Sequence, residues 1–426
     1  MRAQMAITKT ARKTKPMKGK GAPIYMASVK TDAVPPQDWW LGYEGGNGKA
    51  GLAYIDRESK IHTTILPNAR VRVSGGKLEG YGGQVVKVPY ATFGGIHWGF
   101  SDAIWNLTDR QIDTFQGAEE RYGSPEHVFP LLVMMALNNL PDGAYKLVVT
   151  VPPGYYNHVK DAVVDGFGRG NVAVRGKPSG VWEIALDSDK QPRRYSFSAV
   201  FPVMEAADAA ATAAQMGFNG GPILTKGRDG QNLMSGRVTM IDLGFVTADT
   251  PVLVNGALLE DSIATSSDSR GGILSNIAEP IVDAVIATIP GAAKWITPAH
   301  ADYWLRQWAT GGGAGAKAWS EEAGQVSIMG KVLHLAPEFE RYSEAYSRYA
   351  LRKVIAAMNE SSDTAFAVGG GWLYTLQYVE RWYKETKPAM QFASHLDFPH
   401  LKPFSFIDIN LVGLMTIAGL LAEQGY

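Results

Sequence analysis

The sequence predicts an α/β protein with two lobes that face each other across a cleft. Its 426 residues exceed what one compact core ordinarily contains, so two domains are expected. Strand-like runs such as 145–151 alternate with helical patterns such as 126–140. A strand, a glycine turn and a returning strand occur at 39–56 and again at 238–255. We interpret this internal similarity as one hairpin contributed by each lobe.

The composition excludes several classes of protein. Lys and Arg total 41 and Asp and Glu total 41, so the overall charge selects no partner. The absence of cysteine excludes a disulfide framework and a Cys-ligated metal, and cytoplasmic localisation is expected. The apolar stretch at 411–422 is shorter than the roughly 20 residues of a membrane-spanning helix. We therefore expect a packed terminal helix and no membrane span.

Breaks in the pattern divide the chain into five predicted segments. They are a basic flexible tail at 1–36, a first lobe at 37–217, a linker at 218–232, a second lobe at 233–400, and a C-terminal helix at 401–426 that returns to the first lobe. The tail contains Lys and Arg but no acidic residue before Asp32. Two interpretations of the tail stay open: a contact with nucleic acid or an anionic membrane surface, and a segment that is only solvated.

The most specific segment for chemistry is 239–249, in the second lobe. Asp242 ends a buried strand, where a carboxylate is costly unless it meets a cation, water or hydrogen-bond donors. The turn that follows, formed by Gly244, Phe245, Val246 and Thr247, offers backbone N–H groups and a hydroxyl to an anion. Magnesium with phosphate would satisfy both. The alternative is an ordinary hairpin in which Asp242 and Thr247 cap each other.

The first lobe contains the same ingredients at 44–49. Glu44 ends a strand, a tip formed by Gly46, Asn47 and Gly48 offers N–H donors, and Lys49 supplies a positive charge. Two such hairpins from opposite lobes are the arrangement that a triphosphate held between lobes requires. The pair therefore predicts a polyphosphate site in the cleft.

A third segment, at 365–373, is a buried strand followed by glycines that open a helix. Its structural interpretation is a tight strand-to-helix turn, and its functional interpretation is a surface without side chains for a base and ribose. The predicted nucleotide-binding residues outside the two hairpins are Gly271, Gly272, Gly369, Gly370, Gly371 and Trp372.

These three segments resemble, in this order, the phosphate 1, phosphate 2 and adenosine motifs of the actin-like ATPase superfamily. The chain is most similar to the ParM-type plasmid-segregation actins of bacteria and archaea. The resemblance implies an actin-like fold of two RNase H-like domains with ATP or GTP and Mg²⁺ in the cleft. It also implies nucleotide hydrolysis, head-to-tail filaments of the chain with itself, and plasmid DNA segregation with a DNA-binding adaptor protein and a centromere-like DNA.

The resemblance assigns roles to three carboxylates. Glu205 and Asp242 match the catalytic positions, and Glu44 and Asp242 match residues that hold the metal through water. The sequence departs from the family at Glu44, where Asp is general, and near Glu205, where the proline position differs. Glu205 also has a structural interpretation as an acidic residue in the first turn of a helix.

Two other functions on the same superfold remain as alternatives. One is a kinase or phosphatase acting on a small molecule, although no insertion or general base of a sugar kinase is recognisable in the first lobe. The other is a non-filamentous, chaperone-like ATPase, although no β-rich peptide-binding domain follows the ATPase motifs. Sequence alone does not decide filament formation, because head-to-tail contacts use surface loops without a fixed motif.

Overall fold

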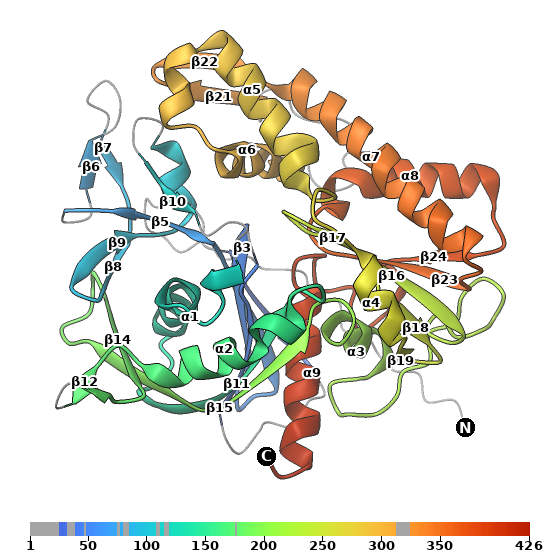
Figure 1. Cartoon of the computed structure of the whole chain (residues 1–426), viewed down its shortest axis with the longest axis horizontal. Helices are drawn as coiled ribbons and strands as arrows, with labels where there is room; N and C mark the ends of the chain where they lie inside the picture. The colour runs from blue at the N-terminus through green and yellow to red at the C-terminus, as the bar shows by residue number, and fades with distance from the viewer. Residues whose placement is uncertain are drawn as a thin grey trace.

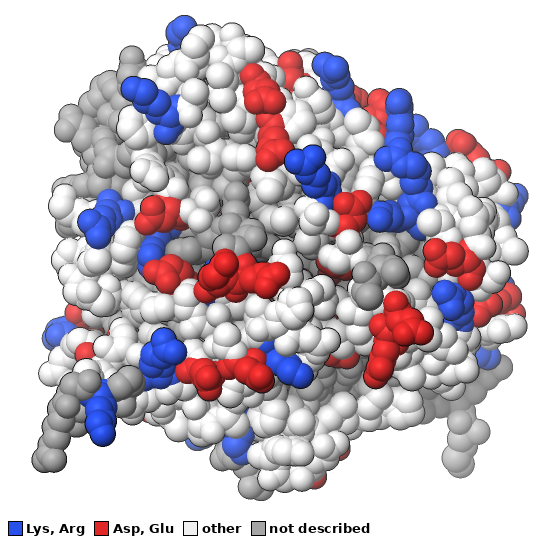
Figure 2. Space-filling model, viewed as in Figure 1, with Lys and Arg blue, Asp and Glu red and all other residues white. Residues whose placement is uncertain are grey.

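The computed structural model describes residues 25–31, 39–46, 48–74, 77–79, 85–107, 111–114, 119–174, 177–311 and 324–426. Within these residues the chain forms two lobes, each built around a β-sheet, and two helices lie between the sheets (Figure 1). Acidic and basic side chains are interspersed over the face that Figure 2 shows. Among the helices that the structure describes, none combines the length and apolar character needed to cross a lipid bilayer.

The first lobe is organised by five central strands in the order β4-β3-β2-β11-β15. They are β2 (Trp40–Glu44), β3 (Lys49–Ile55), β4 (Lys60–Pro67), β11 (Gly143–Val151) and β15 (Arg193–Met204). The first three form an antiparallel meander, whereas β2, β11 and β15 run parallel. Because β2 and β11 are covered on both faces, their sequences are almost continuously apolar.

Further strands extend this sheet at both edges. Beyond β15 lie β14 (Val181–Leu186), β8 (Tyr90–Phe93), β9 (Ile96–Gly99), β5 (Ala69–Arg72) and β10 (Asp113–Thr114). At the other edge β1 (Tyr25–Lys30) pairs antiparallel with β4. Two small hairpins are formed by β6 (Lys77–Glu79) with β7 (Val85–Lys87), and by β12 (Ala173–Val174) with β13 (Lys177–Pro178).

The second lobe repeats the strand order of the first. Its strands are β16 (Arg237–Leu243), β17 (Ala248–Asp249), β18 (Val252–Val254), β19 (Ala257–Leu258), β20 (Ser267–Asp268), β23 (Thr364–Val368) and β24 (Gln391–Ala393). The interrupted strand β17–β18 returns antiparallel to β16, and β16, β23 and β24 run parallel. The strand β16 therefore occupies the position that β2 has in the first lobe.

Helices cover both faces of each sheet. The described α-helices are α1 (Pro125–Leu137), α2 (Tyr156–Arg169), α3 (Ala209–Gln215), α4 (Glu260–Ser266), α5 (Glu279–Thr288), α6 (Pro298–Gly311), α7 (Ala336–Asn359), α8 (Trp372–Thr386) and α9 (Ile409–Glu423). A hairpin of β21 (Gln325–Ile328) and β22 (Lys331–His334) precedes α7. Helices α1 and α2 pack on one face of the first sheet, and α5 to α8 pack on the outer face of the second.

The inner faces of the two sheets share one hydrophobic core. Trp40 and Val148 of the first sheet and Met240 and Phe366 of the second pack against α3 and α9 in this shared core. Glycines allow the close approach of α9. A Cβ at Gly42 of β2 would lie 2.8 Å from Leu414 Cβ, and a Cβ at Gly413 would overlap the carbonyl oxygen of Ala209 in α3. The two lobes are thus joined by packed helices as well as by the chain.

Two expectations from the sequence need correction. Residues 25–30 were expected in a flexible tail, but they form β1, because the edge of β4 offers its backbone groups to a pairing strand. The remaining residues of the expected tail, 1–24 and 32–36, lie outside the described residues. The structural interpretation of Glu205, as an acidic residue in the first turn of a helix, is also wrong, because β15 extends to Met204, a turn follows, and α3 begins only at Ala209.

Candidate functional site

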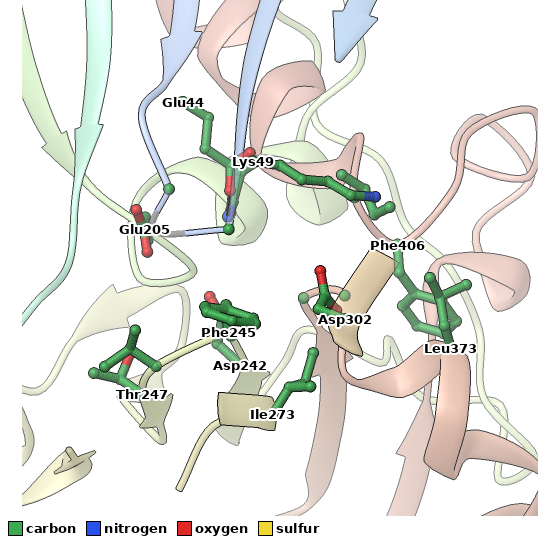
Figure 3. Close-up of a pocket in the computed structure, with 18 of the residues that line it drawn as sticks. Glu44, Lys49, Glu205, Asp242, Phe245, Thr247, Ile273, Asp302, Leu373 and Phe406 are labelled. Carbon is green, nitrogen blue, oxygen red and sulfur yellow. Dashed lines mark hydrogen bonds between the residues drawn. The ribbon is translucent and has the colours of Figure 1, made fainter. Parts of the chain in front are cut away.

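A cavity between the lobes contains most of the residues that the sequence motifs predict. Its lining includes, from those predictions, Glu44, Gly46, Gly48, Lys49, Glu205, Asp242, Gly244, Phe245, Val246, Thr247, Gly369 and Gly370. In Figure 3, Glu44, Lys49 and Glu205 lie on one side of the cavity, and Asp242, Phe245 and Thr247 lie on the other. Gly271, Gly272, Gly371 and Trp372 are not part of the lining, and Asn47 lies outside the described residues.

The turn between β2 and β3 is held from behind by two side chains. Asn68 Nδ2 donates to the carbonyl oxygen of Gly46 at 2.6 Å, and its backbone N–H donates to that of Gly48. The buried Arg121 guanidinium donates to the carbonyl oxygens of Gly45 and Gly46. In a trans peptide the C=O and the N–H of the next residue point in opposite directions. The carbonyl groups of Gly45 and Gly48 point toward Arg121 and Asn68, so the N–H groups of Gly46 and Lys49 point away from these two residues. That orientation suits an anion.

The turn after β16 is held in the same way by the backbone. The carbonyl oxygens of Gly244, Phe245 and Val246 accept hydrogen bonds from the N–H groups of Ile273, Leu274 and Gly272, respectively. Gly272 is needed for this contact, because any Cβ would collide with Val246 and Phe245. The N–H groups of residues 245–247 therefore point away from these bonds, an orientation that suits an anion.

The two turns meet across the cleft. A Cβ at Gly48 would lie 3.1 Å from the ring of Phe245, closer than most such contacts, so glycine at this position favours the close approach of the two turns. The hydroxyl of Thr247 donates to Asp249 at 2.8 Å rather than to Asp242. Asp242 and Thr247 therefore do not cap each other, which was the structural alternative for this hairpin.

The glycines after β23 bring that strand end beside Asp242. β23 runs parallel to β16 with Val368 opposite Asp242, so the next residue lies beside the carboxylate. Gly369 has φ 91°, and a side chain there would collide with Asp242 Oδ1. Trp372 is fully buried and donates its indole N–H to the carbonyl oxygen of Ile241, so it anchors the turn from the core.

Glu205 is presented by a strained turn. It follows β15 directly, and its N–H donates to the carbonyl oxygen of Val151. The next residue, Ala206, has φ 51°, a left-handed conformation that is unfavourable for a residue with a Cβ. Asn410 of α9 accepts from the N–H of Ala206 at 3.2 Å and donates to Glu44 Oε1 at 3.4 Å. One amide thus contacts both the Glu44 carboxylate and the backbone of the residue that follows Glu205.

The carboxylates around the cavity raise one another's pKa. Burial and the neighbouring Asp242 raise the pKa of Glu44 to about 8. Burial and the neighbouring Glu44 and Asp249 raise the pKa of Glu205 to about 8. Burial, Glu205 and Asp249 raise the pKa of Asp242 well above its ordinary value. In the absence of a cation, these groups therefore favour their protonated forms near neutral pH.

Lys49 shows the opposite effect on the same side of the cavity. Burial and the nearby Arg306 lower its pKa to about 7, against the influence of Asp302, Asp102 and Asp408. Its ammonium group therefore lacks sufficient negative charge around it. An anion bound in the cavity would stabilise the charged form.

Sequence reasoning did not identify several residues of the site. Asn68, Arg121 and Asn410 act on the motifs from distant points in the chain, and no local spacing marks them. Asp302 and Arg306 of α6 and Tyr374 of α8 also line the cavity. The only local signal for Asp302 and Arg306 is their i,i+4 spacing on a helix, and such spacing is common on exposed helix faces.

The pKa shifts predict a pH dependence of stability in protein freed of nucleotide and magnesium. A carboxyl group whose pKa is higher in the folded protein than in the unfolded chain stabilises the fold in its protonated form. For Glu44 this contribution is complete at pH values below the ordinary pKa of 4.5, and it is lost as the pH rises through about 8. We expect Glu44→Gln, which cannot ionise, to melt at a higher temperature than the wild type, with a larger gain at pH 8.5 than at pH 5. Each kcal/mol should shift the melting temperature by about 2–4 °C in a lobe of this size.

Differential scanning calorimetry at both pH values measures this gain. Lys49 is present in both proteins, so its own pH dependence, a stability that rises with pH above about 7, largely cancels in the difference. Glu260→Gln, at an exposed position of α4, is the control and should show no such trend. An equal gain for Glu44→Gln at pH 5 and pH 8.5 would contradict the prediction.

Comparison with known proteins identifies the fold. No family model and no curated protein matches the sequence. Among solved structures, Bacillus thuringiensis ParM with ATP superimposes with a TM-score of 0.59 at 13% identity, covering 91% of this chain and 100% of that one. The apo psk41 ParM protein gives a TM-score of 0.54 at 13% identity over 91% of this chain and 98% of its own. An archaeal actin homologue gives 0.55 at 14% identity over 89% and 99%.

The chain therefore has the two-lobed actin-like fold. The expectation of this fold, drawn from the three sequence motifs, is confirmed over about nine-tenths of the chain. The actin-like proteins that it resembles include several ParM structures and an archaeal actin homologue, and the repeated order of strands in the two lobes agrees with that likeness.

Proposed function

We propose that this protein binds a nucleoside triphosphate with Mg²⁺ between its lobes and hydrolyses it. The observation that carries the proposal is the meeting of two glycine turns in one cavity, each with its carbonyl groups held from behind and a carboxylate at its base. The Bacillus thuringiensis ParM structures with ATP and with ADP support it, because the same fold holds a nucleotide in those proteins.

In this proposal the polyphosphate lies between the turns at 44–49 and 242–247. Backbone N–H groups of both turns donate to its oxygens, and Lys49 neutralises part of its charge. The ribose and base lie along Gly369 and Gly370, two lining residues that have no side chains. Glu205 orients the attacking water and accepts its proton.

The carboxylates fit a magnesium ion that is held through water. In the chain as far as it is described, no group of three His, Asp or Glu side chains has the geometry to bind a metal directly. Glu44 and Asp242 nevertheless line the same cavity, and each has a raised pKa that nearby positive charge would relieve. Bound with the polyphosphate, Mg²⁺ would neutralise charge on the phosphate oxygens and on these two residues.

We further propose that nucleotide binding drives head-to-tail assembly of the chain into filaments and that hydrolysis drives their disassembly. The likeness to ParM structures supports this step, and it supports a cytoplasmic role in plasmid DNA segregation with a DNA-binding adaptor protein and a centromere-like DNA. A heterologous contact between two ends of a molecule that does not close into a ring produces such a filament.

The test combines assembly with turnover. We expect light scattering and the pelleted fraction to increase when magnesium with ATP or GTP is added to the full chain, and phosphate release to accompany the increase. Samples without nucleotide, and samples with nucleotide and EDTA, serve as controls. Phosphate release without any pelleted protein would favour the non-filamentous ATPase. Absence of both nucleotide binding and phosphate release would overturn the proposal.

A further inference from the structure

The end of the cavity away from the carboxylates has a distinct chemical character. Its walls include the apolar side chains of Ile273, Leu373 and Phe406. Figure 3 shows Leu373 and Phe406 close together on one wall. In that view Ile273 and Asp302 lie between this wall and the turns at 44–49 and 242–247, which we call the phosphate turns. A flat aromatic ring suits such a slot, and it lies where the base of the proposed nucleotide would lie.

Three polar side chains interrupt this apolar end, and the ammonium group of Lys49 lies near two of them, Arg306 and Asp302. Arg306 Nε donates to Asp302 Oδ2 at 3.0 Å, and the Tyr374 hydroxyl donates to Asp302 Oδ1 at 3.5 Å. The side chains of Asp302 and Arg306 are only 7% and 12% exposed, and both residues line the cavity. Each carboxylate oxygen can accept a second hydrogen bond, so Asp302 retains the capacity to accept from a ligand.

Buried charges in a binding slot are costly unless a ligand or a partner satisfies them. A pair that only stabilised the helix would gain little from facing a cavity, since i,i+4 pairs stabilise equally well on an exposed face. The two carboxylate oxygens of Asp302, which accept, lie directly beside the guanidinium of Arg306, which only donates. This pattern of acceptors and donors can be matched against the edges of the nucleobases.

The match is to guanine. Its N1–H and N2 amino group are adjacent donors that a carboxylate accepts, and its O6 and N7 are adjacent acceptors that a guanidinium binds. Adenine has an acceptor at N1 and a donor at N6, so its edge would place an acceptor against Asp302 and a donor against Arg306. Such mismatched pairs leave buried polar groups unsatisfied.

We propose that Asp302 and Arg306 read the base of the nucleotide and that this protein prefers guanine to adenine nucleotides. This inference rests on the proposed function and extends it from a nucleoside triphosphate to a particular base. Asp302 accepts from N1–H and the N2 amino group, and Arg306 donates to O6 and N7. Tyr374 holds the carboxylate in place from the side of α8.

Isothermal titration of the full chain with diphosphates in the presence of magnesium tests the proposal without turnover. We expect GDP to bind at least about tenfold more tightly than ADP, and IDP, which lacks the N2 amino group, to bind about tenfold more weakly than GDP. Asp302→Asn should bring the affinities for GDP and ADP to within about threefold of each other. Asp283→Asn, an exposed carboxylate on the neighbouring α5, should keep the preference of the wild type.

The outcomes separate the two proposals. ADP binding as tightly as GDP would overturn the guanine preference and leave nucleotide binding intact. Weaker binding of 2′-deoxy-GDP than of GDP, together with equal binding of IDP and GDP, would also overturn the guanine preference. In that case Asp302 and Arg306 would contact the ribose 2′-hydroxyl instead of the base. The IDP comparison uses the wild-type protein and so remains decisive if Asp302→Asn does not fold. Absence of binding by every diphosphate and by GTP and ATP would instead contradict the proposed function.

Discussion

Glu205→Gln is expected to slow nucleotide hydrolysis by about 10²–10⁴-fold while leaving nucleotide affinity nearly unchanged. Glutamine preserves the size of the side chain and can still accept a hydrogen bond, but it cannot take a proton from water. Burial and its acidic neighbours raise the pKa of Glu205 to about 8, so its carboxylate, once a bound cation favours the ionised form, is a stronger base than an ordinary glutamate. The strained turn at Ala206 and the bond to Asn410 hold the group toward the cavity in advance.

Phosphate release measured in a single turnover, with protein in excess over nucleotide, isolates this step from assembly and product release. Glu120→Gln is the matched control, since Glu120 is exposed in the short helix that precedes α1. It should hydrolyse at the rate of the wild type. Hydrolysis by Glu205→Gln at that same rate would show that another group accepts the proton, and weak binding would assign Glu205 to nucleotide affinity instead.

The second large effect is expected at Gly413, in the helix between the two sheets. Gly413→Ala should lower the free energy of unfolding by about 3 kcal/mol, the upper part of the range for an overpacked core. The added Cβ would overlap the carbonyl oxygen of Ala209, a backbone atom of α3 that cannot rotate away. Moving α9 to relieve this overlap would disturb its contacts with Gly42 and Gly51 of the first sheet.

The same helix supplies the control. A Cβ at Gly419 has no atom within 4 Å, so Gly419→Ala should stabilise the protein by up to about 1 kcal/mol through helix propensity. Urea unfolding of both variants measures the difference. If Gly413→Ala unfolds at the same urea concentration as Gly419→Ala, the close packing of α3 on α9 does not stabilise the protein as described.

The elements found from the sequence are those whose local pattern is strong. The apolar strand at 40–44 with its glycine turn, the strand ending at Asp242, and the strand before Gly369 are visible because buried strands and glycine turns have distinctive compositions. Their convergence in one cavity was predicted because a triphosphate held between lobes requires donors from both. In the structure β16 and β23 run parallel and end side by side, whereas β2 reaches the cavity from the other sheet. The fold class could be predicted from the order of these three motifs.

What could not be predicted depends on contacts between distant residues. Arg121 lies more than 70 positions from the turn that it holds, and Asn410 lies 366 positions from Glu44. The strand β1 has no clear alternation and forms because β4 offers an edge. At Ala206, alanine-rich sequence favours a helix, but the packing of α9 against this turn imposes a left-handed residue instead.

The packing of α3 and α9 between the two sheets limits how the halves of the molecule can move. Any separation of the sheets at this layer would expose a continuous core, so relative motion must be a rotation about it. The phosphate turns lie next to this axis and would move little. A second contact joins the lobes, because the ring of Trp105 in the first lobe lies against that of His300 in the second with centroids 5.1 Å apart. Opening the cleft would therefore be resisted at this contact as well as at the α3–α9 layer.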